Sequence, residues 1–402
     1  MKRVFVTGMG VISALGNGLE ANLIALQQAK SGLKPIKNLD TIHRNKWLAA
    51  EIDLDNNQLI NLIPKFNSTK PSTRGQLLSI IAANEAISNA DLTKKEVSEM
   101  PIIGANTVGG MDITEQYYHN YTEAHPYFFN QSHSAGETTR KIAKYLKSNA
   151  FISTINTACS SSANAIILGT RLIKSGRAKR VLVGGSDPLT KFSLSGFASL
   201  VIYDEQVCKP FDANRAGLNL GEAGAYLILE SEDVIGDKDI YAEVLAYANR
   251  NDAYHASASS PDGEGAYRTM QQALNMAHLE PKDISFIHAH GTATPNNDET
   301  ESIAMKRLFA DEMPFFASSK SFTGHTLGAA GALNAIYAIL ALKHSFLFPN
   351  LNFKIPMDKD IIPVTHYQKD VVLENVLSNA FGFGGNNSSL IFGKVEKGGP
   401  DE

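Results

Sequence analysis

Two distant segments of the chain resemble each other, and this internal similarity restricts the fold more than any other feature of the sequence. Residues 86–97, AISNADLTKKEV, and residues 273–284, ALNMAHLEPKDI, share two alanines four positions apart, then a leucine, two charged positions and a β-branched residue. Each segment follows an apolar helix pattern and precedes a short apolar strand and a loop. Similarity of this kind predicts a duplicated fold with two similar halves.

A second pair of segments supports the duplication. Residues 155–176 and residues 318–345 both run from a polar turn into a helix of small and apolar residues. Strand and helix patterns alternate along the chain, which is typical of the α/β class. We expect buried strands at residues 3–7, 101–105, 180–183, 225–230, 284–289 and 390–393, and helices at residues 75–89, 160–175, 267–277 and 328–343.

Composition narrows the class of protein. Of the 402 residues, 43% are hydrophobic and 19% are charged, which is typical of a globular protein with a sizeable core. The net charge of −4 argues against nucleic acid as the main partner. With two cysteines and no CxxC motif, we expect neither a disulfide framework nor a structural zinc site, and a reducing, cytoplasmic setting fits best.

Two apolar stretches could suggest export or a membrane, and we interpret both as buried elements. The N-terminal stretch follows two basic residues, but Thr7, Gly8 and Ser13 interrupt it, which favours a buried first strand and a turn over a signal peptide. Residues 335–342 are too few to cross a bilayer and favour a buried helix. We therefore expect no membrane insertion.

Cys159 is the first candidate for chemistry, because it lies in TACSSSANAII where a helix is expected to begin. The positive end of a helix dipole and its unpaired N–H groups favour the thiolate, which is the nucleophilic form of cysteine. The alternative is a small buried hydrophobic side chain, which is what most free cysteines are. Cys208, in QVCKPFD, lacks the helix context, and there the unreactive interpretation is favoured.

Two histidines next to glycine-containing turns are the next candidates. His290 lies in HAHGTATP after an expected strand, and His325 lies in KSFTGHTLGAAG, the segment that matches the one around Cys159. Function in α/β folds concentrates at such strand and turn ends. One cysteine and two histidines could also bind zinc. Their wide spacing does not resemble a zinc motif, but separated ligands stay an alternative at this point.

The sequence FGFGGNN, residues 381–387, predicts a glycine-rich turn. Glycine permits a positive φ and a close approach of the backbone to a ligand. No GK[ST] follows, which excludes a phosphate loop, whereas exposed backbone N–H groups could form an oxyanion hole. Near the N-terminus, Ser13 stands where a dinucleotide-binding fingerprint has its third glycine, so NAD binding is not expected.

Together these motifs resemble the β-ketoacyl-[acyl carrier protein] synthases of the elongating KAS I/II type, in the thiolase-like superfamily. The resemblance spans nearly the whole chain and rests on six motifs in order: VTGMGVISALG, TACSS, PFDANRAGLNLGEAGAYLILE, HGTATPNND, KSFTGH with GAAGA, and FGFGGNN. It implies a five-layered αβαβα fold of two similar halves. Residues 1–238 would carry the nucleophile, and residues 239–402 would carry both catalytic histidines.

The resemblance also implies roles for the site residues. Cys159 accepts the acyl chain, and the backbone N–H groups of Cys159 and Phe383 hold the thioester oxygen, with Phe383 also acting as a gate. His290 and His325 stabilise the enolate that forms when malonyl-carrier protein loses carbon dioxide. The other implied residues are Lys320 in the catalytic set, Glu301 and Asp298 as supporting acids, Thr292 and Thr294 at the phosphopantetheine arm, and Val108 in the acyl pocket.

The implied partners are acyl carrier protein and a second chain, either a copy in a homodimer or a chain-length factor in a heterodimer. No metal and no cofactor is implied beyond the phosphopantetheine of the carrier. From position alone, Lys65, Lys70, Arg74 and Lys209 are candidates for a basic patch that receives the carrier. The retained cysteine, histidines and lysine argue against a non-catalytic partner subunit and against a biosynthetic thiolase.

Some positions depart from the family pattern. Asn386 stands where threonine is usual, and PNND stands where Gly-Asp is common. These changes border the pocket and the pantetheine channel, so they bear on the substrate more than on the chemistry. The sequence leaves open whether the chain serves fatty acid elongation or the aryl polyene and flexirubin branch of type II polyketide synthesis.

Overall fold

The strands divide into two sets that repeat one topology. The computed structural model describes residues 2–66, 72–118, 132–310 and 312–395. The first set contains β1 (Val4–Ser13), β5 (Ile102–Ala105), β6 (Ile152–Ile155), β7 (Arg180–Asp187) and β8 (Ala223–Ser231), and the second contains β9 (Ala242–Asn251), β10 (Phe286–His288), β11 (Phe315–Ala317), β14 (Asn375–Gly382) and β15 (Asn386–Gly393).

The order of the strands confirms the predicted duplication. The first set runs β6-β5-β7-β8-β1 and the second runs β11-β10-β14-β15-β9, so corresponding strands take corresponding places. In both sets the first three strands pair in parallel and the others pair antiparallel. Two residue pairs between β1 and β9 join the sets. The expected boundary at residues 238 and 239 falls between β8 and β9.

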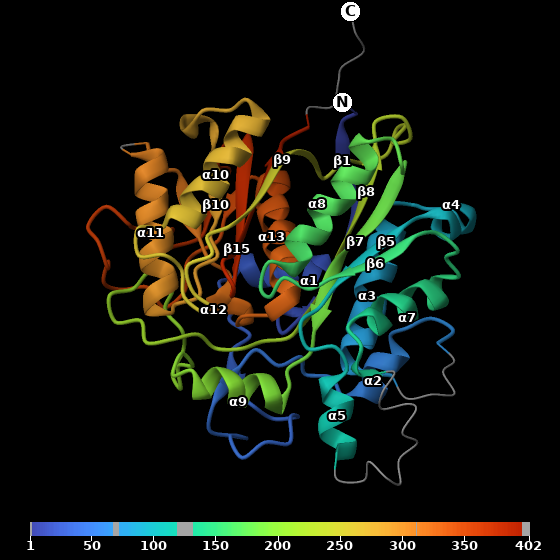
Figure 1. Ribbon diagram of the computed structural model, residues 1–402, viewed down its shortest axis with the longest axis horizontal. Coiled ribbons are helices and arrows are strands. Elements are labelled where there is room, and N and C mark those ends of the chain that lie inside the picture. Colours follow the sequence, from blue (N-terminus) through green and yellow to red (C-terminus); the bar gives the residue numbers. More distant parts are fainter. Residues whose placement is uncertain (1, 67–71, 119–131, 311, 396–402) are drawn as a thin grey trace, which may run out of the picture.

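Helices add three layers to the two sets of strands (Figure 1). They are α3 (Arg74–Asn89) and α7 (Gly136–Leu146) outside the first set, α8 (Ser161–Lys174) and α13 (Ala330–His344) at the centre, and α10 (Glu264–Ala277) and α11 (Pro295–Phe309) on the outer side of the second. Contacts of α8 and α13 reach both sets of strands, whereas α3 packs on β1 and β8, and α10 packs on β9 and β15. The result is the expected αβαβα arrangement.

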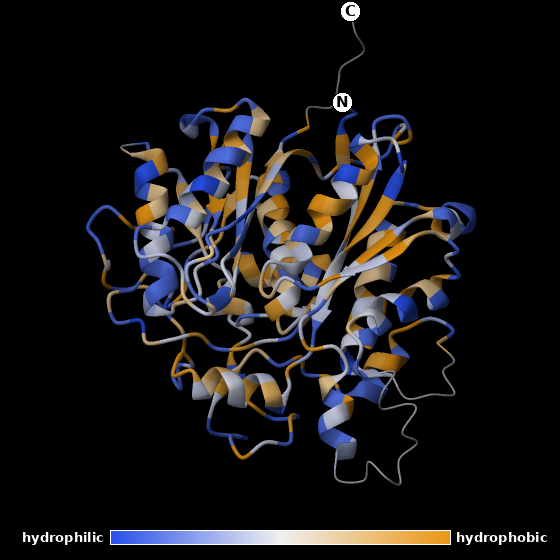
Figure 2. Ribbon diagram, in the orientation of Figure 1, coloured by the Kyte–Doolittle hydropathy of each residue, from blue (hydrophilic) through white to orange (hydrophobic). Residues whose placement is uncertain are grey.

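The central helices form the core of the molecule. Residues 330–342 of α13 are all buried, and Figure 2 shows the strands and the central helices as its most hydrophobic parts. A Cβ on Gly331 would lie 2.5 Å from the backbone nitrogen of Ala163, so the two helices touch backbone to backbone. The stretch Leu327–His344 is long and apolar enough to cross a membrane, which corrects our length argument, but 89% of it is buried inside the protein.

The first strand is longer than expected. We predicted that it would end at residue 7 in a turn, but β1 continues to Ser13 with every residue buried. The glycines that interrupt the apolar pattern are contact points, because a Cβ on Gly10 would lie 2.0 Å from the carbonyl oxygen of Ala82 in α3. A register shift between Val6 and Gly8 marks the irregularity.

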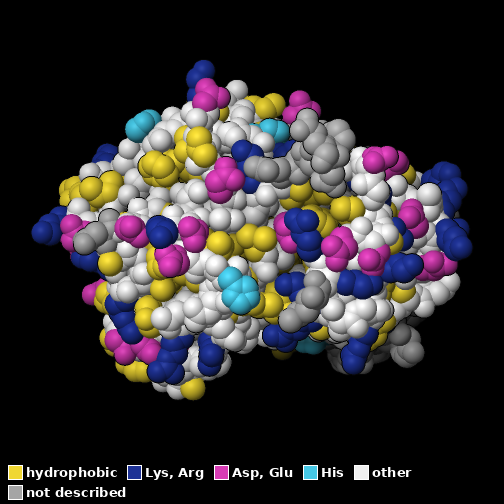
Figure 3. Space-filling view, turned by 90° about the horizontal axis from the view of Figure 1, so that it is seen from above, with side chains coloured by type: hydrophobic (Ala, Val, Ile, Leu, Met, Phe, Trp, Pro, Cys, Tyr) yellow, Lys and Arg dark blue, Asp and Glu magenta, His cyan; other side chains and the backbone are white. Residues whose placement is uncertain are grey.

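The remaining elements are shorter and lie around these layers. They are α1 (Leu19–Gln27), α2 (Asn56–Asn61), α4 (Lys94–Glu99), α5 (Met111–Tyr117), α9 (Lys191–Ser199), α12 (Lys320–Thr323), the 3₁₀ helices η2 (Pro281–Asp283) and η3 (Leu327–Ala329), and the strands β2 (Gly16–Asn17), β3 (Lys34–Pro35), β4 (Leu48–Ala49), β12 (Phe346–Leu347) and β13 (Gln368–Lys369). On the face in Figure 3, Lys and Arg side chains lie among Asp and Glu side chains and form no single basic patch.

Candidate active site

Cys159 lies on a tight turn between β6 and α8. Ala158, just before it, has a φ of 52°, and Ser160 is the N-cap of the helix. The turn is held by Ser161, whose hydroxyl accepts the N–H of Thr157 at 2.8 Å. Such a turn presents the cysteine at the end of the helix, and the Cys159 side chain is 5% exposed.

Glycine in the second half lets β14 approach this turn. A Cβ on Gly382 would lie 2.7 Å from the carbonyl oxygen of Thr157 and 3.2 Å from the backbone nitrogen of Cys159. The turn that follows contains Gly384 and Gly385, with φ of 80° and 74°. The predicted glycine-rich turn is therefore present, and it lies against the cysteine.

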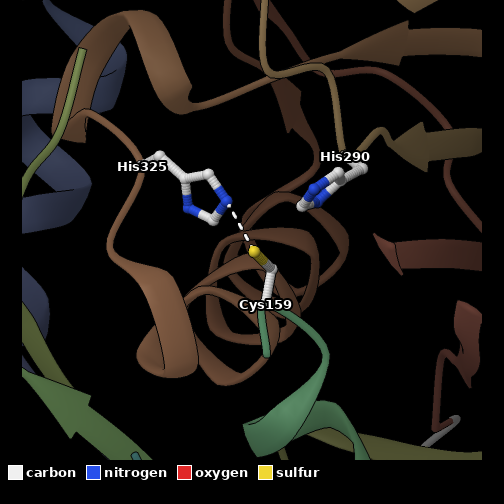
Figure 4. A group of neighbouring side chains, drawn as sticks. All are labelled: Cys159, His290 and His325. Carbon is white, nitrogen blue, oxygen red and sulfur yellow. Dashed lines mark hydrogen bonds between the residues drawn. The ribbon is translucent and has the colours of Figure 1, made fainter. Parts of the chain in front are cut away.

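His325 contacts the Cys159 sulfur directly. It lies between α12 and η3, and its Nε2 is 3.0 Å from Sγ (Figure 4). The backbone N–H of Leu327, a residue with a φ of 51°, donates to Nδ1 at 3.1 Å. Since Nδ1 accepts a hydrogen bond, the proton of the neutral ring is on Nε2 and points at the sulfur.

His290 completes the group from the end of β10. Its ring centroid is 5.4 Å from that of His325, edge to face, and ligand atoms of both rings and of Cys159 lie within 4.8 Å of one another. The Glu301 carboxylate accepts the backbone N–H groups of His290 and Gly291, both at 2.8 Å. Glu301 therefore fixes the loop that carries the histidine.

Lys320 and Asp298 lie behind the histidines. Lys320, 2% exposed, has its Nζ 3.5 Å from Oδ1 of Asn334. Asp298 accepts the backbone N–H groups of Phe211 at 2.7 Å and Ala293 at 3.1 Å, so it shapes the loop after His290. The predicted supporting residues therefore lie close to one another, and the Glu301 and Asp298 carboxylates accept hydrogen bonds from backbone N–H groups.

Burial and the Lys320 charge keep both histidines neutral. Burial holds the pKa of His290 and of His325 well below the usual value, and the positive charge of Lys320 lowers both further. Burial also lowers the pKa of Lys320 to about 8 and raises the pKa of Glu301 to about 7. Two neutral imidazoles are therefore available as hydrogen-bond donors at neutral pH.

The expected thiolate is wrong for the resting site. We predicted that the helix end would favour ionisation of Cys159, but burial raises the pKa of its thiol to about 11. The Lys320 charge and the backbone N–H groups of Phe383 and Cys159 lower that pKa without overcoming burial. These same two N–H groups are the ones that we expected to form an oxyanion hole.

The hydrogen bonding of His325 argues against the zinc alternative. Coordination through Nε2 would place the ring proton on Nδ1. That proton would face the backbone N–H of Leu327, which donates to Nδ1. Two donors cannot share this contact, so the site suits hydrogen-bond donation to an oxyanion better than a metal ion.

The three side chains line a cavity of about 280 Å³. Thr292 and Thr294 also line it, with their hydroxyl oxygens 2.8 Å apart. Phe383 lines it too and stacks on Phe197 at a centroid distance of 5.8 Å. Val108 is not among the residues that line this cavity; it packs against the same apolar cluster as Phe197.

The basic patch proposed from position is partly wrong. Arg74 is paired with Glu222, with its Nη2 2.7 Å from Oε1, and its guanidinium is mostly buried. Lys65 is exposed, Lys209 is half-buried, and Lys70 lies outside the described residues. Nothing in the sequence pattern distinguished a buried arginine from an exposed one.

Cys208 is buried and its thiol donates to the Lys320 carbonyl oxygen, as the unreactive interpretation requires.

Sequence reasoning treated Asn386 only as a departure from the family pattern, and the structure gives it a central place. Its Oδ1 accepts three hydrogen bonds, from Ser160 at 2.8 Å, Asn164 at 2.9 Å and Asn249 at 2.7 Å. This network ties β15 and β9 to the start of α8, one residue after Cys159. In the sequence, the only sign of this role was the presence of asparagine where threonine is usual in the family.

Comparison with known proteins agrees with this geometry. Residues 1–234 match the family described as beta-ketoacyl synthase, N-terminal domain, and residues 241–354 match its C-terminal domain. The 3-oxoacyl-[acyl-carrier-protein] synthase 2 of Staphylococcus aureus (strain COL) is 32% identical, over 98% of this chain and 99% of the relative. The enzyme of that name from Synechocystis sp. is also 32% identical, with the same coverage.

Solved structures give the same result. The ishigamide ketosynthase/chain length factor superposes with a TM-score of 0.90 at 32% identity, covering 98% of this chain and 100% of that one. The ketosynthase ApeO in complex with its chain length factor ApeC, from Xenorhabdus doucetiae, gives a TM-score of 0.84 at 29% identity and covers 98% of each chain. The chain belongs to the β-ketoacyl synthase family.

Proposed function

We propose that this chain is a 3-oxoacyl-[acyl-carrier-protein] synthase, which loads an acyl chain onto Cys159 and condenses it with a malonyl unit held by acyl carrier protein. One observation carries the proposal. A buried thiol, two neutral histidine donors and two backbone N–H groups converge in one cavity. These are the groups that a thioester exchange and a decarboxylation need.

The first step is acyl transfer. The thioester carbonyl oxygen of the donor lies between the N–H groups of Cys159 and Phe383, which stabilise the negative charge of the tetrahedral intermediate. The sulfur of Cys159 attacks the carbonyl carbon. The carrier thiol leaves and takes up the proton that Cys159 gives up. The high pKa of the buried thiol makes its deprotonation the costly part of this step.

The second step uses the histidines. The thioester oxygen of malonyl-carrier protein accepts hydrogen bonds from His290 and from Nε2 of His325 as carbon dioxide leaves. The resulting enolate attacks the acyl-Cys159 thioester carbonyl, and a new C–C bond forms as the C–S bond to Cys159 breaks. The sulfur leaves as a thiolate and takes up a proton from solvent, and the 3-oxoacyl product departs on the carrier. Neither step changes the net oxidation state, so the proposal requires no redox cofactor.

The partners follow from the relatives. We infer that acyl carrier protein supplies both substrates and that a second ketosynthase-like chain completes the assembly. Similarity to the ishigamide and ApeO–ApeC structures supports a chain-length factor as that second chain. The equal identity to the staphylococcal synthase supports a homodimer in fatty acid elongation as the second candidate. We place the reaction in the cytoplasm, where reducing conditions keep Cys159 free.

Intact-mass spectrometry tests the proposal. The chain is incubated with a panel of saturated, polyenoyl and aryl-polyenoyl carrier proteins and then chased with malonyl-carrier protein, beside Cys159→Ala. A gain of one acyl group on the native chain alone, lost in the chase with a 3-oxoacyl product, is expected. The donor that loads best identifies the chain type. If no donor acylates the folded chain with its partner present, the proposal fails.

A further inference from the structure

Helix α9 ends with a residue that its backbone disfavours. The N–H of Val201 donates to the Ala198 carbonyl at 2.9 Å, and the N–H of Ile202 donates to the Phe197 carbonyl at 3.5 Å. This pair of bonds is the Schellman motif, in which the residue after the C-cap is left-handed and usually glycine. Val201 occupies that position with a φ of 58°. A β-branched residue is poorly suited to this region.

Folding does not explain the valine. Its side chain is 87% exposed, so it contributes little packing to offset the strain. Leu200, the C-cap residue before it, is also 49% exposed. Two neighbouring apolar side chains are therefore held in solvent by a turn that glycine would form more readily. Residues whose backbone strain is not offset by packing tend to occur at functional positions.

The position of Val201 suggests why an exposed, strained valine is present here. Val201 lines the cavity that contains Cys159. The apolar pair inside the Schellman motif, Phe197 and Ile202, lines it as well, and Phe197 stacks on Phe383. In Figure 1, α9 lies apart from the layers of strands and central helices. The end of α9 thus forms part of the cavity wall and places Val201 at its rim.

We propose that Val201, together with Leu200, is an apolar seat for the acyl carrier protein while its prosthetic arm occupies the cavity. This inference rests on the proposed function and deepens it. An arm that reaches Cys159 through this cavity brings its carrier to the rim, where an apolar side chain exposed to this degree gains from being covered. The matching carrier surface presents an apolar side chain beside the attachment point of the arm.

Three substitutions and two substrates test the proposal. Val201→Ala, Val201→Gly and Val201→Asp are assayed with acyl-carrier protein and with the same acyl group on free pantetheine, which has no protein surface. We expect the KM for acyl-carrier protein to rise about three- to tenfold in the Ala and Gly variants and more in the Asp variant. The KM for acyl-pantetheine and kcat should change less than twofold.

Val201→Gly adds a second readout, because it relieves the backbone. Its Tm should be equal to or higher than that of the native chain, while its KM for the carrier is worse. A merely structural role predicts instead that the carrier KM rises only where the Tm falls. Val372→Ala is the matched control: Val372 is 77% exposed but precedes β14, whose opposite end at Gly382 lies at the site. Its carrier KM should not change.

Each other outcome overturns the inference. An unchanged carrier KM in all three Val201 variants removes the docking role, and an equal change with free acyl-pantetheine assigns Val201 to the channel instead. A change in oligomeric state on light scattering assigns the patch to a second chain. If the native protein turns over neither substrate, the proposed function fails and this inference fails with it. If the native protein is active but the Val201 variants behave otherwise than expected, only this inference fails.

Discussion

The two halves of the molecule share one strand order and differ in what their loops carry. In the first half, the turn between β6 and α8 holds Cys159. In the second half, the corresponding connection from β11 to α13 holds His325, and its Nε2 meets the cysteine sulfur at 3.0 Å. The duplication therefore brings two equivalent helix starts face to face, one with the Cys159 thiol and one with the His325 imidazole.

The difference extends to the loops after the second strand of each half. The loop after β10 carries His290, whose backbone is fixed by Glu301. The loop after β5 carries Thr107 and Val108, whose backbone N–H groups donate to Asp187. The first half thus positions a sulfur, and the second positions the groups that stabilise negative charge. Substitutions that affect acyl loading and malonyl decarboxylation separately would support this division, and substitutions that abolish both together would break it.

The largest effect is expected for Cys159→Ala. Acyl loading should be abolished because the nucleophile is absent, whereas decarboxylation of malonyl-carrier protein should continue because its donors lie in the second half. Intact mass measures the first reaction and release of carbon dioxide the second. Cys208→Ala is the matched control, since Cys208 is the other free, buried cysteine, and it should load normally. Loss of both reactions in Cys159→Ala would contradict the division.

His290→Ala tests the opposite side of the comparison. It removes one of two donors to the enolate oxygen, so decarboxylation should fall by about 10²–10³. Loading should change by no more than a few-fold, because His290 has no hydrogen bond to the sulfur among the contacts of the described residues, whereas His325 does. Parallel loss of loading and decarboxylation would show that the two reactions share their machinery.

Lys320→Ala should act on both halves through charge. The lysine lowers the pKa of the Cys159 thiol, so its removal raises that pKa and lowers the thiolate fraction. We therefore expect loading at pH 7 to slow, by about tenfold for each unit by which the thiol pKa rises.

The pH profile of this variant has a definite sign. The pKa of Lys320 is lowered to about 8, so the native enzyme loses the positive charge as the pH rises past that value. The ratio of native to Lys320→Ala loading rates should therefore shrink above pH 8. Lys320→Arg, which stays charged, should keep its advantage to higher pH. A ratio that is constant from pH 6 to pH 9 would exclude the electrostatic role.

The sequence allowed the main elements and the group of Cys159, His290 and His325 to be predicted, because each has a local signature. Short apolar runs located the strands, and motifs next to glycine-containing turns or a helix start located His290, His325 and Cys159. The direction in which the pKa of Cys159 shifts could not be predicted from the sequence, since burial depends on which segments pack around the turn. Burial of Arg74 and the packing of Val108 against an apolar cluster are likewise properties of packing.

Asn386 shows most clearly what the sequence alone could not predict. Substitution of this residue has the smallest effect that we predict. Its Oδ1 holds Ser160 and Asn164 of the nucleophile helix from the strand that follows the Phe383 turn. Asn386→Ala should loosen the two-sided oxyanion hole and slow loading by about fivefold, equivalent to one hydrogen bond of roughly 1 kcal/mol. Decarboxylation, which uses the histidines, should stay within twofold. Asn386→Asp keeps an acceptor of the same shape and should restore most of the loading rate. General destabilisation would instead lower both reactions and would not be rescued by the aspartate, so the two rates measured side by side decide whether this network positions the oxyanion hole.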